Sequence, residues 1–135
     1  MKAVIAMAAL AAVCAAPSAW AGEVCTTGAP AADCTAARPA IGAAVSGPVM
    51  QVMDARSLCV ALGPRPDQWV AVTITDAGPG VTRQGLMDAV FAETVDCVVT
   101  GHDGETASAV CRRGPASVAD LAADAGAAAR AARMR

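Results

Sequence analysis

Two aspartates and one arginine stand where strand-like segments of the sequence end, and this placement could support charged chemistry. Asp54 and Arg56 lie in the short reversal of the stretch "VMDARSLCV", and Asp76 follows the segment "WVAVTIT". Carboxylates at neighbouring strand ends could serve a hydrolase if a general base joined them in one cleft. Arg56 could instead recognise an anion through its planar guanidinium group. We expect the simpler arrangement, in which Arg56 forms an ion pair that holds the reversal.

Other side chains with catalytic potential have simpler interpretations. His102 stands beside Asp103 at an expected turn, which favours a solvated histidine over a base or a metal ligand. Cys59 could be a reactive thiol, but a half-buried strand cysteine or a disulfide partner is favoured. The Arg112-Arg113 pair and the tail "ARAARMR" could contact phosphates or an anionic membrane surface, yet a solvated tail is the simpler interpretation. The sequence contains no phosphate-cradling glycine loop and places no serine beside its single histidine.

Residues 1–21 have the pattern of a secretory signal peptide. Lys2 precedes an apolar stretch that is short for a membrane span, and Ala19-Trp20-Ala21 forms a small-x-small cleavage site. No later stretch is both apolar and long enough to predict a membrane span. We therefore expect an exported protein, periplasmic or extracellular, whose mature chain begins at Gly22.

Five of the six cysteines remain after that cleavage. In an oxidising compartment they favour disulfides over metal ligands, because the sequence has no C-x-x-C pair and only one histidine. Counting alone does not settle the pairing. We expect Cys97 to pair with Cys111 and Cys25 with Cys34, leaving Cys59 unpaired, although another pairing that includes Cys59 stays open.

The composition argues against a protein that coats nucleic acid. Twelve acidic residues face ten basic ones, and of the aromatic residues the mature chain keeps only Trp69 and Phe91. Binding by charge needs clustered basic residues, and binding by base stacking needs aromatic side chains. We therefore expect weak or absent nucleic-acid binding and a monomer, and the sequence names no partner.

An alternation of apolar and polar residues predicts three consecutive strands after Gly47. They are "PVMQVMD", "SLCVAL" with Leu58, Val60 and Leu62 facing inward, and "WVAVTIT" with Val70, Val72 and Ile74 facing inward. Before them, residues 22–46 are rich in alanine, proline and glycine without a sustained period, which predicts an irregular arm.

The second half of the chain predicts a helix, a hairpin and a closing helix. "TRQGLMDAVFAE" has helical spacing, with Leu86, Val90 and less regularly Met87 and Phe91 on one face. "TVDCVVT" and "ASAVCRR" alternate around Gly104, which places Cys97 opposite Cys111. Ser117 opens an S-x-x-D capping pattern, Gly126 is expected to end the helix, and residues 127–135 form a tail of frayed helix or disorder.

This order of elements predicts a mainly β domain with short helices over residues 47–126, a five-stranded OB-type Greek-key barrel. The stretches "VMDARSLCV", "WVAVTITDAGPG" and the run from Thr82 to Gly126 resemble the staphylococcal-nuclease-like (thermonuclease) family in element order and hydrophobic spacing. The resemblance implies a calcium-dependent phosphodiesterase. The family's chemical motifs, however, are largely changed in this chain.

On the metal side, the family's Asp-Gly-Asp-Thr reversal aligns with Asp54, Ala55 and Arg56, so the first acid is kept and the metal-binding second acid is an arginine. Whether Asp76 replaces the family's other metal carboxylate stays open. Calcium prefers six to eight oxygen ligands, and a guanidinium both removes one and repels the ion. We expect no metal and no other cofactor.

On the catalytic side, the resemblance aligns Thr73 with the third-strand arginine, Gly80 with the general-base glutamate and Thr106 with the phosphate-clamping arginine. Loss of a positioned base costs roughly 10²- to 10⁴-fold in rate. These changes predict a non-catalytic binding or structural module. Two alternatives stay open, namely a weak or rebuilt nuclease acting on DNA or RNA, and a disulfide-stapled exported protein unrelated to nucleases.

Overall fold

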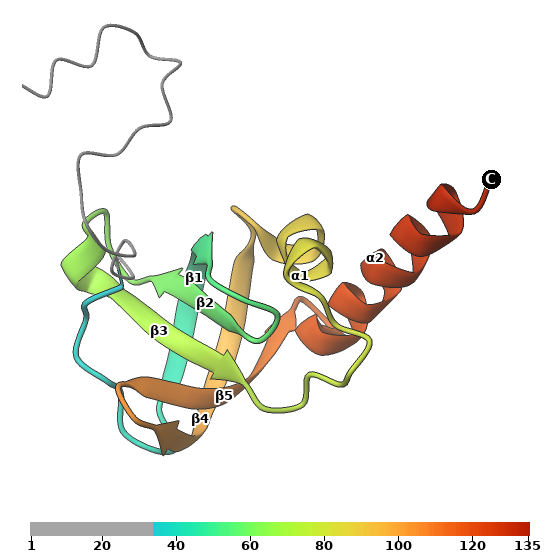
Figure 1. Ribbon diagram of the computed structural model, residues 1–135. Helices are drawn as coiled ribbons and strands as arrows, with labels where there is room; N and C mark the ends of the chain where they lie inside the picture. Colours follow the sequence, from blue (N-terminus) through green and yellow to red (C-terminus); the bar gives the residue numbers. More distant parts are fainter. Residues whose placement is uncertain (1–33) are drawn as a thin grey trace, which may run out of the picture. The chain divides into compact units, whose positions relative to one another are not determined.

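The computed structural model describes residues 34–135, and Figure 1 shows a curved sheet with two helices beside it. The expected signal peptide, the cleavage site and Cys25 lie outside the described residues. The strands are β1 (Ala44–Val52), β2 (Ser57–Ala61), β3 (Trp69–Ile74), β4 (Thr94–Asp103), β5 (Thr106–Arg113) and the two-residue β6 (Ala116–Ser117). The helices are the short 3-10 helix η1 (Pro66–Gln68), α1 (Arg83–Val90) and α2 (Val118–Arg133).

Five of the strands close into a barrel, which confirms the predicted fold class. The sheet runs in the order β3-β2-β1-β4-β5-β6, and β3 also pairs with β5. That last pairing is parallel and joins Val72 to Ala107 and Ile74 to Ala109, whereas the other strand pairs are antiparallel. A strand pairing between the two ends of the sheet leaves no open edge among the five strands. The arrangement is compatible with an OB-like fold.

The barrel closes around one apolar interior because its strands alternate in and out. The inward residues of β3, predicted from the period of two, are all buried: Val70, Val72 and Ile74. Leu58 and Val60 of β2 are likewise fully buried. The prediction for Leu62 is wrong, since 57% of this residue is exposed. β2 ends at Ala61, so the alternation no longer constrains the side chain that follows.

The barrel begins earlier in the sequence than predicted. β1 starts at Ala44 and pairs with β4 from Ala44 to Pro48, so the last residues assigned to the irregular arm belong to the sheet. The arm itself is held by main-chain hydrogen bonds, among them Thr35 N to Pro66 O at 3.1 Å and Ala36 N to Trp69 O at 3.0 Å. Pairing with a neighbouring strand therefore overrides the weak local propensity of this alanine- and glycine-rich stretch.

The helix α1 begins and packs much as the sequence predicts. The Thr82 hydroxyl oxygen accepts a hydrogen bond from Gly85 N at 3.0 Å, which caps the first turn. Leu86 and Val90 are fully buried, while Phe91 follows the helix and is 48% exposed. Phe91 lies beyond the helix end because its backbone has left the helical conformation.

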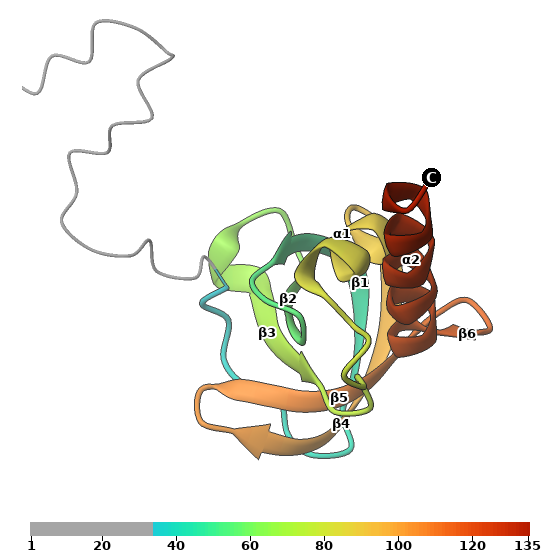
Figure 2. The ribbon, with the colours of Figure 1, turned by 45° about the vertical axis from the view of Figure 1, so that its right-hand side comes forward.

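The helix α2 does not end at Gly126, which corrects the prediction of a stop and a separate tail. It runs without interruption from Val118 to Arg133 and packs beside α1 (Figure 2). The Ser117 side chain makes no capping bond in α2. The residues after Gly126 are mainly alanine and arginine, both strong helix formers, so one interior glycine is tolerated. None of the helices within residues 34–135 is long and apolar enough to cross a membrane.

Two disulfides join described residues, and one of them corrects the expected pairing. Cys97 is bonded to Cys111, directly opposite it in the hairpin, as predicted. Gly104, with a φ of +58°, lies in the turn between Asp103 and Thr106, and a bulge between Val99 and Gly101 brings Cys97 into register with Cys111. Cys34 is bonded to Cys59 and not to Cys25, and Cys59 is therefore not an unpaired thiol. The arm passes beside β3, the neighbour of β2, which brings Cys34 within a Cα–Cα distance of 5.7 Å of Cys59.

Candidate functional site

The carboxylate of Asp54 orders the reversal between β1 and β2. Its Oδ1 atom accepts hydrogen bonds from the main-chain nitrogens of Arg56 and Ser57, each at 2.8 Å. Met53 N donates to Ser57 O at 2.9 Å and closes the same turn. An aspartate that binds main-chain N–H groups two and three residues ahead is a common device for a tight turn. In this structure the acid that matches the family site has a local structural task.

The expected ion pair of Arg56 is not formed. Within residues 34–135 the two ion pairs are Arg65 with Asp67 and Arg113 with Glu93. Arg56 contributes to the fold through its main chain, since its carbonyl oxygen accepts from Ile74 N at 2.7 Å. The residue is exposed, and an exposed guanidinium gains little from an ion pair relative to hydration. The side chain therefore extends from the turn as an exposed cation.

Thr73 and Thr106, the two threonines aligned with family arginines, are neighbours in space. Their hydroxyl oxygens lie 3.0 Å apart. The Thr106 hydroxyl also donates to Asp103 O at 2.9 Å, so its single proton is engaged and Thr73 must be the donor of the pair. The parallel pairing of β3 with β5 brings them together. The Thr73 hydroxyl therefore donates to Thr106, and the Thr106 hydroxyl donates to the main chain, on the outer surface of the barrel.

Asp76 and Gly80 lie in the segment that follows β3. Asp76 is exposed, and its Oδ2 atom accepts a hydrogen bond of 3.4 Å from the Ser117 hydroxyl. No hydrogen bond or ion pair within the described residues joins Asp76 to Asp54 or Arg56. Gly80 is in a turn closed by Val81 N and Gly78 O at 3.2 Å. Across residues 34–135, no group of three or more histidine, cysteine, aspartate or glutamate side chains is placed to hold a metal ion.

The remaining candidates from the sequence hold the fold together. Nε2 of His102 lies 2.7 Å from Pro39 O and Arg38 binds the carbonyl of Gly104, so both contacts fix the arm to the β4–β5 hairpin. Arg112 binds the carbonyl of Pro115. Arg113 donates to Ala89 O at 2.8 Å and connects β5 to α1.

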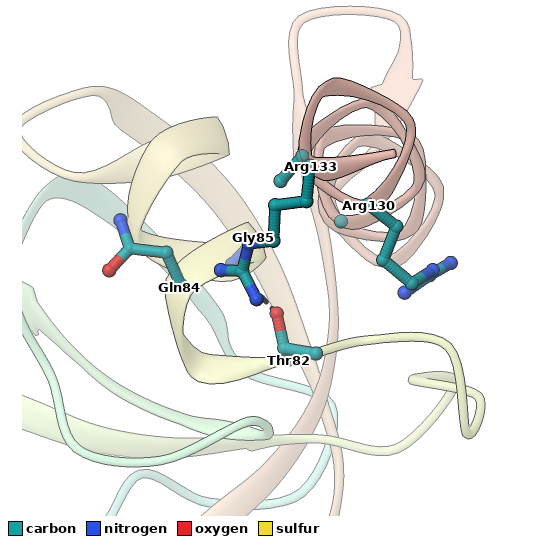
Figure 3. Close-up of a pocket in the computed structure, with 7 residues that line it drawn as sticks. Thr82, Gln84, Gly85, Arg130 and Arg133 are labelled. Carbon is teal, nitrogen blue, oxygen red and sulfur yellow. Dashed lines mark hydrogen bonds between the residues drawn. The ribbon is translucent and has the colours of Figure 1, made fainter. Parts of the chain in front are cut away.

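The structure also contains a pocket beside two arginines that the sequence did not indicate. It has a volume of about 210 Å³ and lies between the start of α1 and the C-terminal half of α2 (Figure 3). The residues that give it its character are Thr82, Gln84, Gly85, Gly126, Arg130 and Arg133. The sequence signal was the spacing of the two arginines, which share a helix face only if α2 continues past Gly126.

A second pocket is apolar and more open. It has a volume of about 370 Å³ and is lined by Pro48, Met50, Ala61, Leu62, Gly63 and Pro64. Met50 and Leu62 are 41% and 57% exposed. These residues contribute no titratable group, so this pocket offers surface for contact and no chemistry of its own.

The positions singled out by the sequence therefore present hydroxyl groups and the exposed Arg56, while the Asp54 carboxylate binds its own turn and the Asp76 carboxylate binds Ser117. Comparison of the chain with protein-family models, with curated proteins and with solved structures finds no match. The fold and the contacts of the individual residues are therefore the basis for a functional proposal.

Proposed function

We propose that this chain is an exported, non-catalytic binding or structural module built on an OB-like barrel. The observation that carries the proposal is the contact of Asp54, whose Oδ1 atom accepts two main-chain hydrogen bonds of 2.8 Å. In the thermonuclease-like pattern that the sequence resembles, this acid opens the reversal, and the metal-binding second acid is replaced here by Arg56. Asp54 orders a turn and stands next to this exposed arginine.

The physics of phosphodiester hydrolysis supports the same proposal. That reaction needs a group that activates water and cations that stabilise charge in the transition state. Thr73 and Thr106 occupy the two arginine positions and are bonded to each other at 3.0 Å. Gly80 has no side chain that could act as a base. A module with this surface is suited to contact or support and not to bond cleavage.

Export is supported by the cysteines. The bonds Cys97–Cys111 and Cys34–Cys59 fit a chain that folds in an oxidising compartment. The signal-peptide pattern of residues 1–21 in the sequence also supports export. Together these features favour the periplasm or the cell exterior as the place of function.

The test is hydrolysis of single-stranded DNA, double-stranded DNA and RNA by the purified, oxidised mature protein. Each substrate is incubated with calcium and with a chelator, and Asp54→Ala serves as the matched variant. We expect no metal-dependent cleavage above the level of the variant. Calcium-dependent cleavage that Asp54→Ala abolishes would overturn the proposal and favour a nuclease site rebuilt around Asp54.

A further inference from the structure

The pocket between α1 and α2 carries two positive side chains and no negative one. Arg130 and Arg133 of α2 line one side, and Thr82 at the start of α1 lines the other. We propose that this pocket binds a small phosphate-bearing anion. The proposal goes beyond the function proposed above, which concerns the turns and the outer surface of the barrel.

The two arginines provide the first argument. They are three residues apart on α2, so their Cα atoms lie on neighbouring turns of the same side of the helix. Neither side chain forms an ion pair or a hydrogen bond with another described residue. In Figure 3 the Arg133 side chain extends from α2 toward Thr82 and Gly85, whereas the Arg130 side chain points away from them. An anion in the pocket would meet Arg133 directly, and Arg130, which is exposed, can turn toward it.

The close approach of the two helices provides the second argument. A Cβ atom on Gly85 would lie 2.6 Å from Ala122 O, so only glycine allows α1 to approach α2 this closely. A Cβ atom on Gly126 would lie 3.3 Å from Gly80 O and 3.6 Å from Nη1 of Arg130. Glycine weakens a helix interior relative to alanine. The presence of Gly126 inside an alanine-rich helix is consistent with the close approach of the Gly80 main chain, which a side chain would crowd.

The donor groups favour phosphate over a carboxylate. Each guanidinium presents paired N–H donors that match two oxygens of a phosphate group. The Thr82 oxygen accepts from Gly85 N at 3.0 Å, which leaves its hydroxyl proton available to a ligand. A phosphate group can place different oxygens on both arginines and on the threonine, whereas a carboxylate has only two oxygens. Gln84 donates one amide hydrogen to Asp88 at 2.7 Å, and its second amide hydrogen remains available as a further donor.

The size of the pocket agrees with this class of ligand. A water molecule occupies roughly 30 Å³ of the liquid, and a phosphate group, whose oxygens are all bonded to one phosphorus, is only a few times larger. The pocket volume is about 210 Å³, which leaves space for part of an esterifying group. Inorganic phosphate, a sugar or glycerol phosphate and a nucleotide therefore share the chemistry that the pocket would recognise.

The experiment is a titration of the oxidised mature protein with inorganic phosphate at constant ionic strength, followed by amide NMR shifts. We expect saturable binding of one phosphate, with the largest shifts at residues 82–85 and 126–133. Arg130→Ala and Arg133→Ala should each weaken binding at least 10-fold. Arg135→Ala removes the same charge from the same end of the chain outside the pocket, and should change the dissociation constant less than twofold.

Parallel titrations with glycerol 3-phosphate, a nucleoside 5′-monophosphate and acetate define the ligand. Tighter binding of one phosphate ester would support the proposal and identify the source of the phosphate group. Acetate binding as tight as phosphate binding would overturn the preference for phosphate. The absence of saturable binding, or an equal loss in Arg135→Ala, would overturn the site. Circular dichroism of each variant verifies that the helices remain folded.

Discussion

The two disulfides lie on opposite faces of the barrel wall and stabilise different kinds of structure. Cys97 and Cys111 point into the barrel, belong to its apolar core and join two strands that already pair through their main chains. Cys59 is equally buried but lies outside the core cluster, and it joins β2 to the irregular arm through Cys34. The inner bond joins two strands that already form part of the barrel, whereas the outer bond attaches a segment that is held otherwise by individual hydrogen bonds to β3 and to the β4–β5 hairpin.

Because of this difference, we expect loss of each disulfide to unfold a different part of the protein. The bonded residues are 14 positions apart for the inner bond and 25 for the outer bond. Loop entropy alone would assign them similar values of about 3 and 3.5 kcal/mol. The inner bond lies within the cooperative core, so its loss weakens the whole domain. The outer bond holds an arm that can detach while the barrel remains folded.

The largest effect is expected for removal of the inner bond. In a Cys25→Ser background, which prevents exchange with the remaining thiol, Cys97→Ala with Cys111→Ala should lower the free energy of unfolding by about 4 kcal/mol. About 3 kcal/mol comes from the loop and the remainder from lost packing of two buried sulfur atoms. Denaturant unfolding of the oxidised protein measures the change. A loss below about 1 kcal/mol would show that the strand pairing alone sustains the hairpin.

A matched pair of leucines tests the same contrast without any disulfide. Leu58 is fully buried, whereas Leu62, four residues later, is 57% exposed. Leu58→Ala should lower the free energy of unfolding by about 3 kcal/mol, because it leaves a cavity inside the barrel. Leu62→Ala should change it by less than about 0.5 kcal/mol. Equal effects in denaturant unfolding would contradict the assignment of inner and outer positions.

Removal of the outer bond should have a smaller and more local effect. In the same Cys25→Ser background, Cys34→Ser with Cys59→Ser should cost about 2 kcal/mol, less than the loop entropy suggests, because the arm detaches before the barrel unfolds. Hydrogen exchange locates the change. The amides of Thr35 and Ala36, which bind Pro66 O and Trp69 O, should exchange faster, while that of Val72 should keep its protection. Uniformly faster exchange would show that arm and barrel unfold together.

The barrel was predictable because its information is local. The period of two predicts the strands from Leu58, Val60 and the β3 residues, and it places Cys97 and Cys111 on the same face of the hairpin, while a bulge in β4 sets the final register between them. Such features depend mainly on the alternation within each strand. They can be recognised in a single sequence because each strand must present one apolar face to the interior.

The features that were not predicted depend on contacts between distant segments. The Cys34–Cys59 bond needs the path of an irregular arm, and the Thr73–Thr106 contact needs the parallel pairing that closes the barrel. The sequence does not predict the continuation of α2, because a glycine such as Gly126 is typical of a helix end. In the structure Gly126 lies inside the helix, where the main chain of Gly80 approaches it closely. The pocket proposed for phosphate depends on the same continuation, because Arg130 and Arg133 belong to α2 only if the helix extends past Gly126.

The smallest predicted effect concerns Asp54, which the sequence singles out for chemistry and the structure places in a turn. Asp54→Ala removes the acceptor of two main-chain hydrogen bonds and should lower the free energy of unfolding by about 1 kcal/mol. Asp54→Asn retains one side-chain oxygen as an acceptor and should lose less than half of that amount. Asp67→Ala is the control, because that aspartate forms only an exposed pair with Arg65 at 3.2 Å and should change stability by less than about 0.5 kcal/mol. Denaturant unfolding compares the three variants. An Asp54→Ala protein as stable as the parent would show that the carboxylate does not hold the reversal, and the reason for an aspartate at this position would then have to be a ligand and not the turn.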